Sequence, residues 1–102
     1  MIQHSVYLRL KASFQDDEKQ AIYDALRELK QDLPGVVDFK AGPNVSTEGL
    51  NGGFLDGFSI LFEDPDARDI FLTDARHREI NERLMAVTDG GLSGMLVFDM
   101  EV

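Results

Sequence analysis

The chain has 102 residues, and nineteen acidic against ten basic side chains give it a formal net charge of −9. This acidic balance argues against nucleic-acid binding, which needs a basic surface, and against docking on an anionic membrane. The absence of cysteine excludes disulfides, zinc–thiolate sites and thiol catalysis. The length predicts one domain over residues 1–102. No apolar run is long enough for a membrane-spanning helix and the N-terminus carries no signal pattern, so we expect a cytoplasmic protein.

The chain begins with a strand pattern over residues 2–10. Apolar side chains alternate with polar ones, which places His4 in the middle of a row formed by Ile2, Val6 and Leu8. A helix follows, with acidic residues at 16–18 where the helix dipole favours negative charge. Its apolar side chains recur at helical spacing, and Pro34 and Gly35 end it. They are Ile22, Leu26, Leu29 and Leu33.

The middle of the chain predicts two strands joined by a long loop. Residues 36–42 and 54–63 alternate in strand phase, and residues 42–53 are rich in Gly, Asn and Ser. Long ordered loops often border a binding site, and a surface insertion is the alternative. We expect residues 43–53 to be mobile and to lie near the mouth of a barrel or pocket.

A second helical region is predicted from residue 65 to about 88. Asp64 and Pro65 form a start signal, and a break is expected near Thr73-Asp74. His77 then begins an apolar stripe that continues through Ile80, Leu84 and Val87. The turn at residues 89–91 leads to a last strand over residues 94–102, with Leu96, Phe98, Met100 and Val102 on one face.

The element order β-α-β-β-α-β predicts an α+β, ferredoxin-like fold. It has one antiparallel four-stranded sheet with two helices on one face. The other face also carries apolar side chains, and a sheet that is apolar on both faces must be covered on both. We therefore expect a second copy of the chain to pack there, sheet against sheet. The side chains concerned are Tyr7, Leu55, Leu61, Met95 and Val97, or else their strand neighbours.

Sequence motifs for common cofactors are absent. The glycines at 49, 52 and 53 do not have the spacing of a P-loop or a dinucleotide fingerprint, and Met95 stands where a nucleophile elbow needs glycine. No metal-ligand spacing such as H-x-x-x-H occurs. The sequence therefore predicts neither a cofactor nor a protein-ligated metal ion.

The two histidines, His4 and His77, both fall on apolar faces that point into the layer between sheet and helices. A neutral imidazole can act as acid or base near neutral pH. The pair therefore suggests a small-molecule pocket, with the alternative that each ring is a buried group bonded to a backbone carbonyl. Candidate lining residues are Ile22, Tyr23 and Leu26, Phe71, and Phe58 or Ile60.

Five motifs together resemble the stress-responsive α/β-barrel (Dabb) family over essentially the whole chain. They are Ile2-x-His4-x-Val6, Leu33-Pro34-Gly35, Gly42-Pro43-Asn44, His77 and Val97-Phe98-Asp99. The resemblance implies a ferredoxin-like homodimer whose two sheets form a shared barrel. It implies no single activity.

A plant polyketide cyclase of this family uses a histidine pair that matches His4 and His77. The tyrosine on the second helix of that cyclase falls at Phe71, which has no hydroxyl. The matching histidine pair is compatible with an acid–base role. Polyketide cyclisation is not favoured, because this chain lacks the tyrosine hydroxyl at position 71. Some relatives also hold a cation near the turn that corresponds to Leu33–Val36, where backbone carbonyls would be the ligands.

Three functions remain open from the sequence. The first is a homodimer that binds a small apolar or aromatic ligand. The second is a cofactor-free lyase or isomerase that uses His4 and His77, and the third is a purely structural dimer. Dimeric-barrel monooxygenases share the architecture, but no residue argues for oxygen chemistry. An open cavity that exposes both imidazoles favours the first two, and a filled core with both rings bonded to backbone favours the third.

Overall fold

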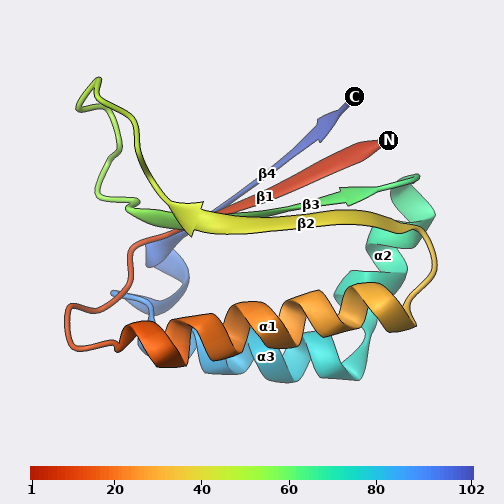
Figure 1. Ribbon diagram of the computed structural model, residues 1–102, viewed down its shortest axis with the longest axis horizontal. Helices are drawn as coiled ribbons and strands as arrows, with labels where there is room; N and C mark the ends of the chain where they lie inside the picture. The colour runs from red at the N-terminus through yellow and green to blue at the C-terminus, as the bar shows by residue number, and fades with distance from the viewer.

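The computed structural model describes residues 1–102 as one antiparallel sheet with helices on one face (Figure 1). The strands lie in the order β2-β3-β1-β4, so the first and third strands are central. This confirms the predicted α+β, ferredoxin-like fold. The elements are β1 (Ile2–Leu8), α1 (Asp16–Asp32), β2 (Val36–Pro43), β3 (Asp56–Phe62), α2 (Pro65–Thr73), α3 (Ala75–Val87), a short 3-10 helix η1 (Gly91–Gly94) and β4 (Met95–Glu101).

The core lies between the sheet and α1, α2 and α3. Val6 and Leu8 of β1 are 3% and 0% exposed, and Leu26 of α1 is 1% exposed. Burying one such side chain contributes about 1.5–3 kcal/mol. The alternation of β1 and the helical spacing of α1 therefore fix how the two elements pack, and they place His4 on the helix-covered face of the sheet.

The second helical region is two helices, and the break falls where the sequence predicts it. Asp64 caps α2 by accepting a hydrogen bond from the Ala67 amide at 2.8 Å, with Pro65 in the first helical turn. Asp74 lies between the helices and accepts a hydrogen bond from the Arg76 amide at 2.8 Å. Because Asp74 caps α3, the chain turns there, and His77 falls in the first turn of the new helix.

The turn after α1 requires glycine. Gly35 has a φ of +80°, and a Cβ built on it would lie 2.5 Å from the Cβ of Ala67 in α2. The Gly35 carbonyl accepts a hydrogen bond from the Glu63 amide at 2.9 Å. These contacts hold the start of α2 against the end of α1. The cation that the family resemblance implies at this turn stays a prediction.

Several strand ends differ from the sequence prediction. β1 ends at Leu8 and not at residue 10, because the chain turns off there and Leu10 forms an isolated bridge to Thr88. β3 begins at Asp56 and not at residue 54, so the loop covers residues 44–55 and Leu55 belongs to it. β4 spans 95–101 in place of 94–102. The predicted alternation agrees with the structure in β1 and β3, whereas an irregularity between Val36 and Asp38 in β2 leaves Val37 without a strand partner.

The face of the sheet that no helix covers is called the open face. Of the two alternatives predicted for β4, the structure places Leu96 and Phe98 on this face, and Met95 and Val97 on the helix side. The register pairs Val6 with Val97 on the helix side and Tyr7 with Leu96 on the open face. The open face therefore includes five large apolar side chains and a polar centre of Gln3, Ser5 and Ser59. The apolar ones are Tyr7, Leu61, Leu96, Phe98 and Met100.

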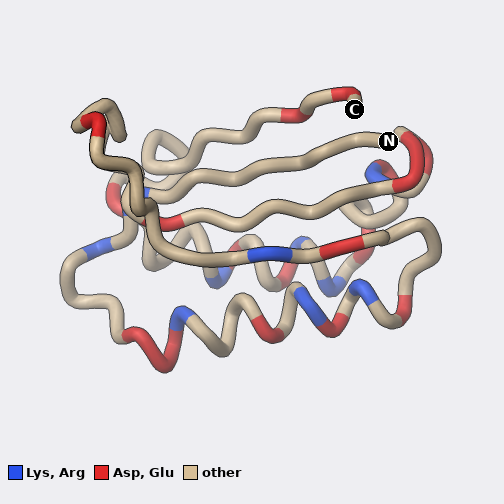
Figure 2. Tube along the Cα trace, turned by 45° about the horizontal axis from the view of Figure 1, so that its top comes forward, with Lys and Arg blue, Asp and Glu red and all other residues tan.

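Charged residues lie mostly along the helices and connecting segments (Figure 2). Among the strands, β2 carries Asp38 and Lys40, β3 begins with Asp56, and β4 carries Asp99 and Glu101. The open face therefore bears few charges, which suits association with another surface. None of the helices combines the length and apolar character needed to cross a bilayer.

Candidate functional site

His4 is buried in the layer between sheet and helices and bonded to a carboxylate. It is 4% exposed, and its Nδ1 lies 2.6 Å from Oδ1 of Asp99. The β1–β4 register sets these two residues directly opposite each other. The other carboxylate oxygen of Asp99 accepts a hydrogen bond from Arg68 of α2 at 3.2 Å. His4 is thus held by a side chain and not by the backbone carbonyl of the structural alternative.

His77 reaches the same layer from α3. Its ring centroid lies 5.1 Å from that of Phe71, and its Nδ1 is buried without a hydrogen-bond partner. Burial lowers the pKa of His77, and the positive charge that His4 can carry lowers it further. The nearby Leu72 carbonyl and Asp74 carboxylate act in the opposite direction. The net effect favours the neutral imidazole.

The two histidines are joined by a row of aromatic rings. His4 contacts Phe62 with centroids 6.1 Å apart, Phe62 contacts Phe71 at 5.3 Å, and Phe71 contacts His77. We call these four residues the histidine cluster. The sequence prediction placed His4, His77 and Phe71 around one site, and the fold brings them together.

A second aromatic group lies further along β3. Tyr23 contacts Phe58 at 6.1 Å, and Phe58 stacks on Phe39 at 5.9 Å. The Tyr23 hydroxyl is buried without a hydrogen-bond partner. Burial, assisted by the charge of Asp56, raises the pKa of Tyr23 well above its usual range. This hydroxyl therefore stays protonated and remains able to donate.

The predicted lining residues divide between these groups. Phe71 belongs to the histidine cluster, whereas Tyr23 and Phe58 form the second group, with Ile60 between Phe58 and Phe62 on the same face of β3. Ile22 and Leu26 are 3% and 1% exposed and are part of the core. The predicted lining residues thus form one continuous layer, with the two histidines at one end and the Tyr23 hydroxyl at the other.

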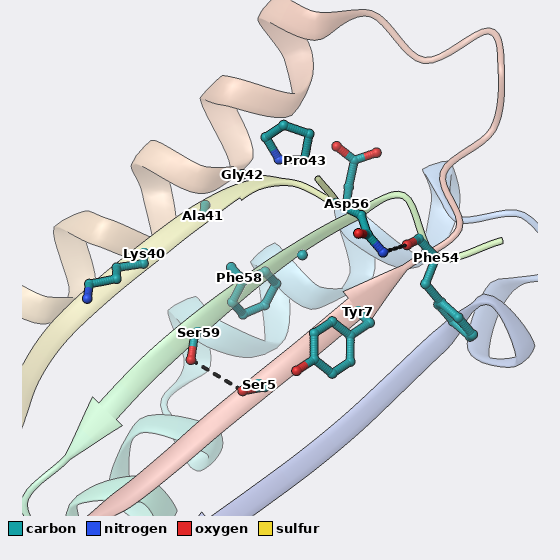
Figure 3. Close-up of a pocket in the computed structure, with 12 residues that line it drawn as sticks. Ser5, Tyr7, Lys40, Ala41, Gly42, Pro43, Phe54, Asp56, Phe58 and Ser59 are labelled. Carbon is teal, nitrogen blue, oxygen red and sulfur yellow. Dashed lines mark hydrogen bonds between the residues drawn. The ribbon is translucent and has the colours of Figure 1, made fainter. Parts of the chain in front are cut away.

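The described cavities lie elsewhere. One of about 410 Å³ is on the open face and touches Ser5, Tyr7 and Lys40 (Figure 3). Another of about 240 Å³ lies between α1 and α3 and touches Asp32 and Arg76. Neither is lined by a histidine. A pocket between sheet and helices therefore remains a prediction. The structure has no group of three or more His, Asp or Glu side chains placed to hold a metal ion.

Sequence reasoning missed Asp99 and Arg68 as site residues. Asp99 entered only as part of a family motif, and Arg68 not at all. Asp99 could have been found by pairing strand 2–10 with strand 94–102. Asp99 lies on the opposite face of its strand from Phe98, and that opposite face also carries His4. No sequence signal gave the register that sets it against His4.

The sequence matches the family model described as the stress responsive A/B barrel domain over residues 2–102. The chain belongs to this family. Membership of the stress-responsive A/B barrel family agrees with the observed sheet order and with the helices on one face. No curated protein matches the chain.

Solved structures agree with the family. A dimeric ferredoxin-like protein of unknown function from Jannaschia sp. CCS1 is 30% identical, with a TM-score of 0.92 over 99% of this chain and 98% of that one. A Dabb family protein from Mesorhizobium loti is 20% identical, with a TM-score of 0.74 over 99% and 95%. The hydroxynitrile lyase from Passiflora edulis is 16% identical, with a TM-score of 0.84 over 99% and 92%, and this likeness shows the fold alone.

Proposed function

We propose that this A/B barrel protein is a homodimer that binds a small apolar or aromatic molecule between its sheet and helices. The observation that carries the proposal is the pair of buried, unpartnered polar atoms, the Tyr23 hydroxyl and Nδ1 of His77. An unsatisfied buried polar atom costs about 1–3 kcal/mol, and native structures leave few of them. A ligand with a hydrogen-bonding group and an aromatic body would satisfy such an atom and replace ring contacts in the layer.

Binding in this layer requires side chains to move, because the aromatic rings now pack against one another. The Phe62–Phe71 and Phe71–His77 contacts are the ones a ligand near the histidine cluster would open. Aromatic ligands suit this exchange, since they restore edge-to-face contacts with the rings they separate. The ligand class is therefore a small ring that carries one donor or acceptor.

A second function, proton transfer, is favoured by the His4–Asp99 contact. A carboxylate 2.6 Å from Nδ1 favours the tautomer with the proton on Nδ1, which leaves the lone pair on Nε2. His4 would act as the base and His77 as the donor to a developing oxyanion. The Passiflora enzyme supports this only by showing that a lyase occurs on the same fold.

The homodimer is proposed because the open face is apolar and the solved relatives include dimeric ferredoxin-like proteins. Light scattering at micromolar concentration should give twice 11.4 kDa. The interface should bury about 1,200 Å² or more. Phe98→Asp should give monomers because it buries a charge in that interface, whereas Ile70→Asp on exposed α2 should not. A monomeric wild-type protein would contradict the proposal.

The experiment that separates the three functions uses 5-nitrobenzisoxazole, a flat aromatic molecule whose ring opens when a base removes its C3 proton. Binding is followed by NMR shifts of the His77 ring and the Tyr23 hydroxyl region. The expected result is a saturable shift at both groups. If acid–base chemistry operates, His4→Gln lowers turnover by roughly 10²-fold while the dimer remains folded.

The remaining outcomes decide against parts of the proposal. Binding with turnover that does not depend on His4 supports a binding protein and rejects the enzyme. No shift at either group, together with lower melting temperatures for His4→Gln and His77→Gln, identifies the layer as a structural core. Lys30→Gln, in the last turn of α1 and outside both aromatic groups, serves as the control for both measurements.

A further inference from the structure

We propose that the cavity of about 410 Å³ on the open face is a second binding site, for a small planar carboxylate. It lies on the opposite side of the sheet from His4 and His77, so it does not rest on the ligand site proposed there, although it shares the open face with the proposed dimer interface. Its volume falls within the range of small-molecule pockets. Figure 3 shows the side chains around it.

The hollow exists because two glycines face each other across neighbouring strands. Gly42 of β2 pairs with Gly57 of β3, and both residues face the open side. A Cβ on Gly42 would meet nothing within 4 Å, whereas one on Gly57 would lie 2.9 Å from the Val6 carbonyl and 3.2 Å from the Tyr7 ring. Glycine within a strand often marks the close approach of a ligand or another backbone. Here the pair leaves a bare floor beside an aromatic wall.

The groups around this floor can hold a ring with a carboxylate. Tyr7 pairs with Gly57 and offers its ring as a side wall. Lys40 pairs with Ser59, and its side chain is 82% exposed, with only a loose 3.6 Å contact between its ammonium and Asp38. Ser59 accepts a hydrogen bond from the Gln3 amide, so its own proton is free for Ser5 at 3.3 Å or for a ligand oxygen.

The one carboxylate among the lining residues is already neutralised. Asp56 is 15% exposed and is paired with Lys19 of α1 at 2.9 Å. This leaves Lys40 as the only cation among the lining residues. A negative group on the ligand is therefore the one that fits. The loop after β2 rises on the side of the sheet away from the helices and adds Asn44 and Phe54 to the rim (Figure 1).

A side chain of a second copy is the competing occupant, and the lining argues against it. Three of the five large apolar side chains of the open face lie on β4, at Leu96, Phe98 and Met100, and β2 is the opposite edge of the sheet. A partner packing on apolar side chains would seek β4. The hollow combines the rings of Tyr7 and Phe54 with hydroxyls, an amine and glycine backbone, and an apolar side chain of a partner would leave those polar groups unpaired.

The test is an NMR titration of the full chain with benzoate, with neutral benzamide as the matched probe. Benzoate should produce saturable shifts at the Gly42 and Gly57 amides, and benzamide should bind more weakly. Lys40→Gln should weaken benzoate binding by about fivefold, because a charge-assisted hydrogen bond is stronger than a neutral one. Gly42→Val should abolish binding, since the valine side chain fills a space that is open in the native protein.

A control variant and four outcomes test the proposed carboxylate site. Lys30→Gln on α1 should leave benzoate binding unchanged. The proposal is overturned if Gly42 and Gly57 do not shift, if benzamide binds as well as benzoate, or if Gly42→Val dissociates the dimer, which would make the hollow a socket for the partner. Shifts confined to His77 and Tyr23 would also overturn it, while supporting the site on the other side of the sheet.

Discussion

The helix-covered face and the open face of the sheet come from the same strands but meet different surroundings. On the covered face Val6, Ile60 and Phe62 are 3%, 1% and 0% exposed. On the open face Tyr7 and Phe98 remain 42% and 53% exposed. Since strand side chains alternate between faces, each face carries its own apolar row. The covered row stabilises the single chain, and the open row is left for association.

The polar groups differ between the faces in the same way. On the covered face His4, Asp99 and Arg68 form a connected set whose members are fixed by hydrogen bonds. On the open face Lys40 is held only loosely. A fixed, buried imidazole suits chemistry or selective hydrogen bonding, whereas an exposed ammonium beside a hollow suits reversible binding of an anion. This difference is why we propose different kinds of site on the two faces.

The largest expected effect tests which face stabilises the chain. Phe62→Ala should lower the free energy of unfolding by about 3–5 kcal/mol, because it opens a cavity in a closed core. Phe98→Ala should lower it by about 1 kcal/mol or less in dilute samples where the dimer has dissociated. Urea denaturation at several protein concentrations measures both, since stability depends on protein concentration only where a dimer interface contributes to it. Equal losses for the two variants would contradict the division between the faces.

A matched pair of glycines gives the next largest effect. Gly35→Ala should destabilise the protein by about 2 kcal/mol, because the position has a positive φ and the new Cβ would lie 2.5 Å from Ala67. Gly42→Ala should raise stability by about 0.5 kcal/mol, since nothing opposes the methyl group and alanine loses less backbone freedom in a strand. Thermal melting of the two variants measures both changes in stability. A loss at Gly42 as large as that at Gly35 would show that the hollow is filled.

Much of this comparison could be predicted from the sequence, because it rests on alternation and local signals. The alternation of strand residues predicts that both faces of the sheet are apolar. The polar pair Thr73-Asp74 predicts the break before α3. What pattern alone could not give is register. The pairing of His4 with Asp99 and of Gly42 with Gly57 each depends on which residues of two strands stand opposite.

The ends of elements and the cavities also escaped sequence reasoning. β1 was extended to residue 10, although Leu10 leaves the sheet to bridge Thr88 near the end of α3. The pocket was predicted between sheet and helices on the strength of the histidines. The cavity on the open face arises because Gly42 and Gly57 have no side chains. The sequence of one strand does not show which residue of the neighbouring strand lies opposite a glycine.

A smaller effect concerns the pH dependence of the covered face. Burial holds the pKa of His77 below the ordinary value of 6.5, so the unfolded chain binds this proton more readily than the folded one. The resulting stability is complete above the unfolded pKa and is lost as the pH falls through the lower folded pKa. His77→Gln should therefore flatten part of the fall in stability below about pH 6.5. Parallel curves for variant and wild type would contradict the shift.

The smallest effect distinguishes parts of the loop that borders the open face. Its base is held by hydrogen bonds, in which the Asn44 and Asn51 side chains accept from the amides of Ser46 and Gly53, each at 2.8 Å. Its tip carries Leu50, which is 82% exposed. We expect the Gly49 and Leu50 amides to exchange faster than Ser46 and Gly53, and all of these faster than the amides of β3, because few contacts resist opening at the tip.

Hydrogen exchange measured by NMR on the dimer gives this order directly. Phe98→Asp, which should release the partner, provides the matched control. If the loop is free in the dimer, its exchange rates will be the same in both proteins while amides on β4 speed up. Protection of Leu50 that equals that of β3 and disappears in Phe98→Asp would place the loop against the partner subunit. The open face would then extend beyond the sheet, and the hollow at Gly42 would be reached from inside the barrel.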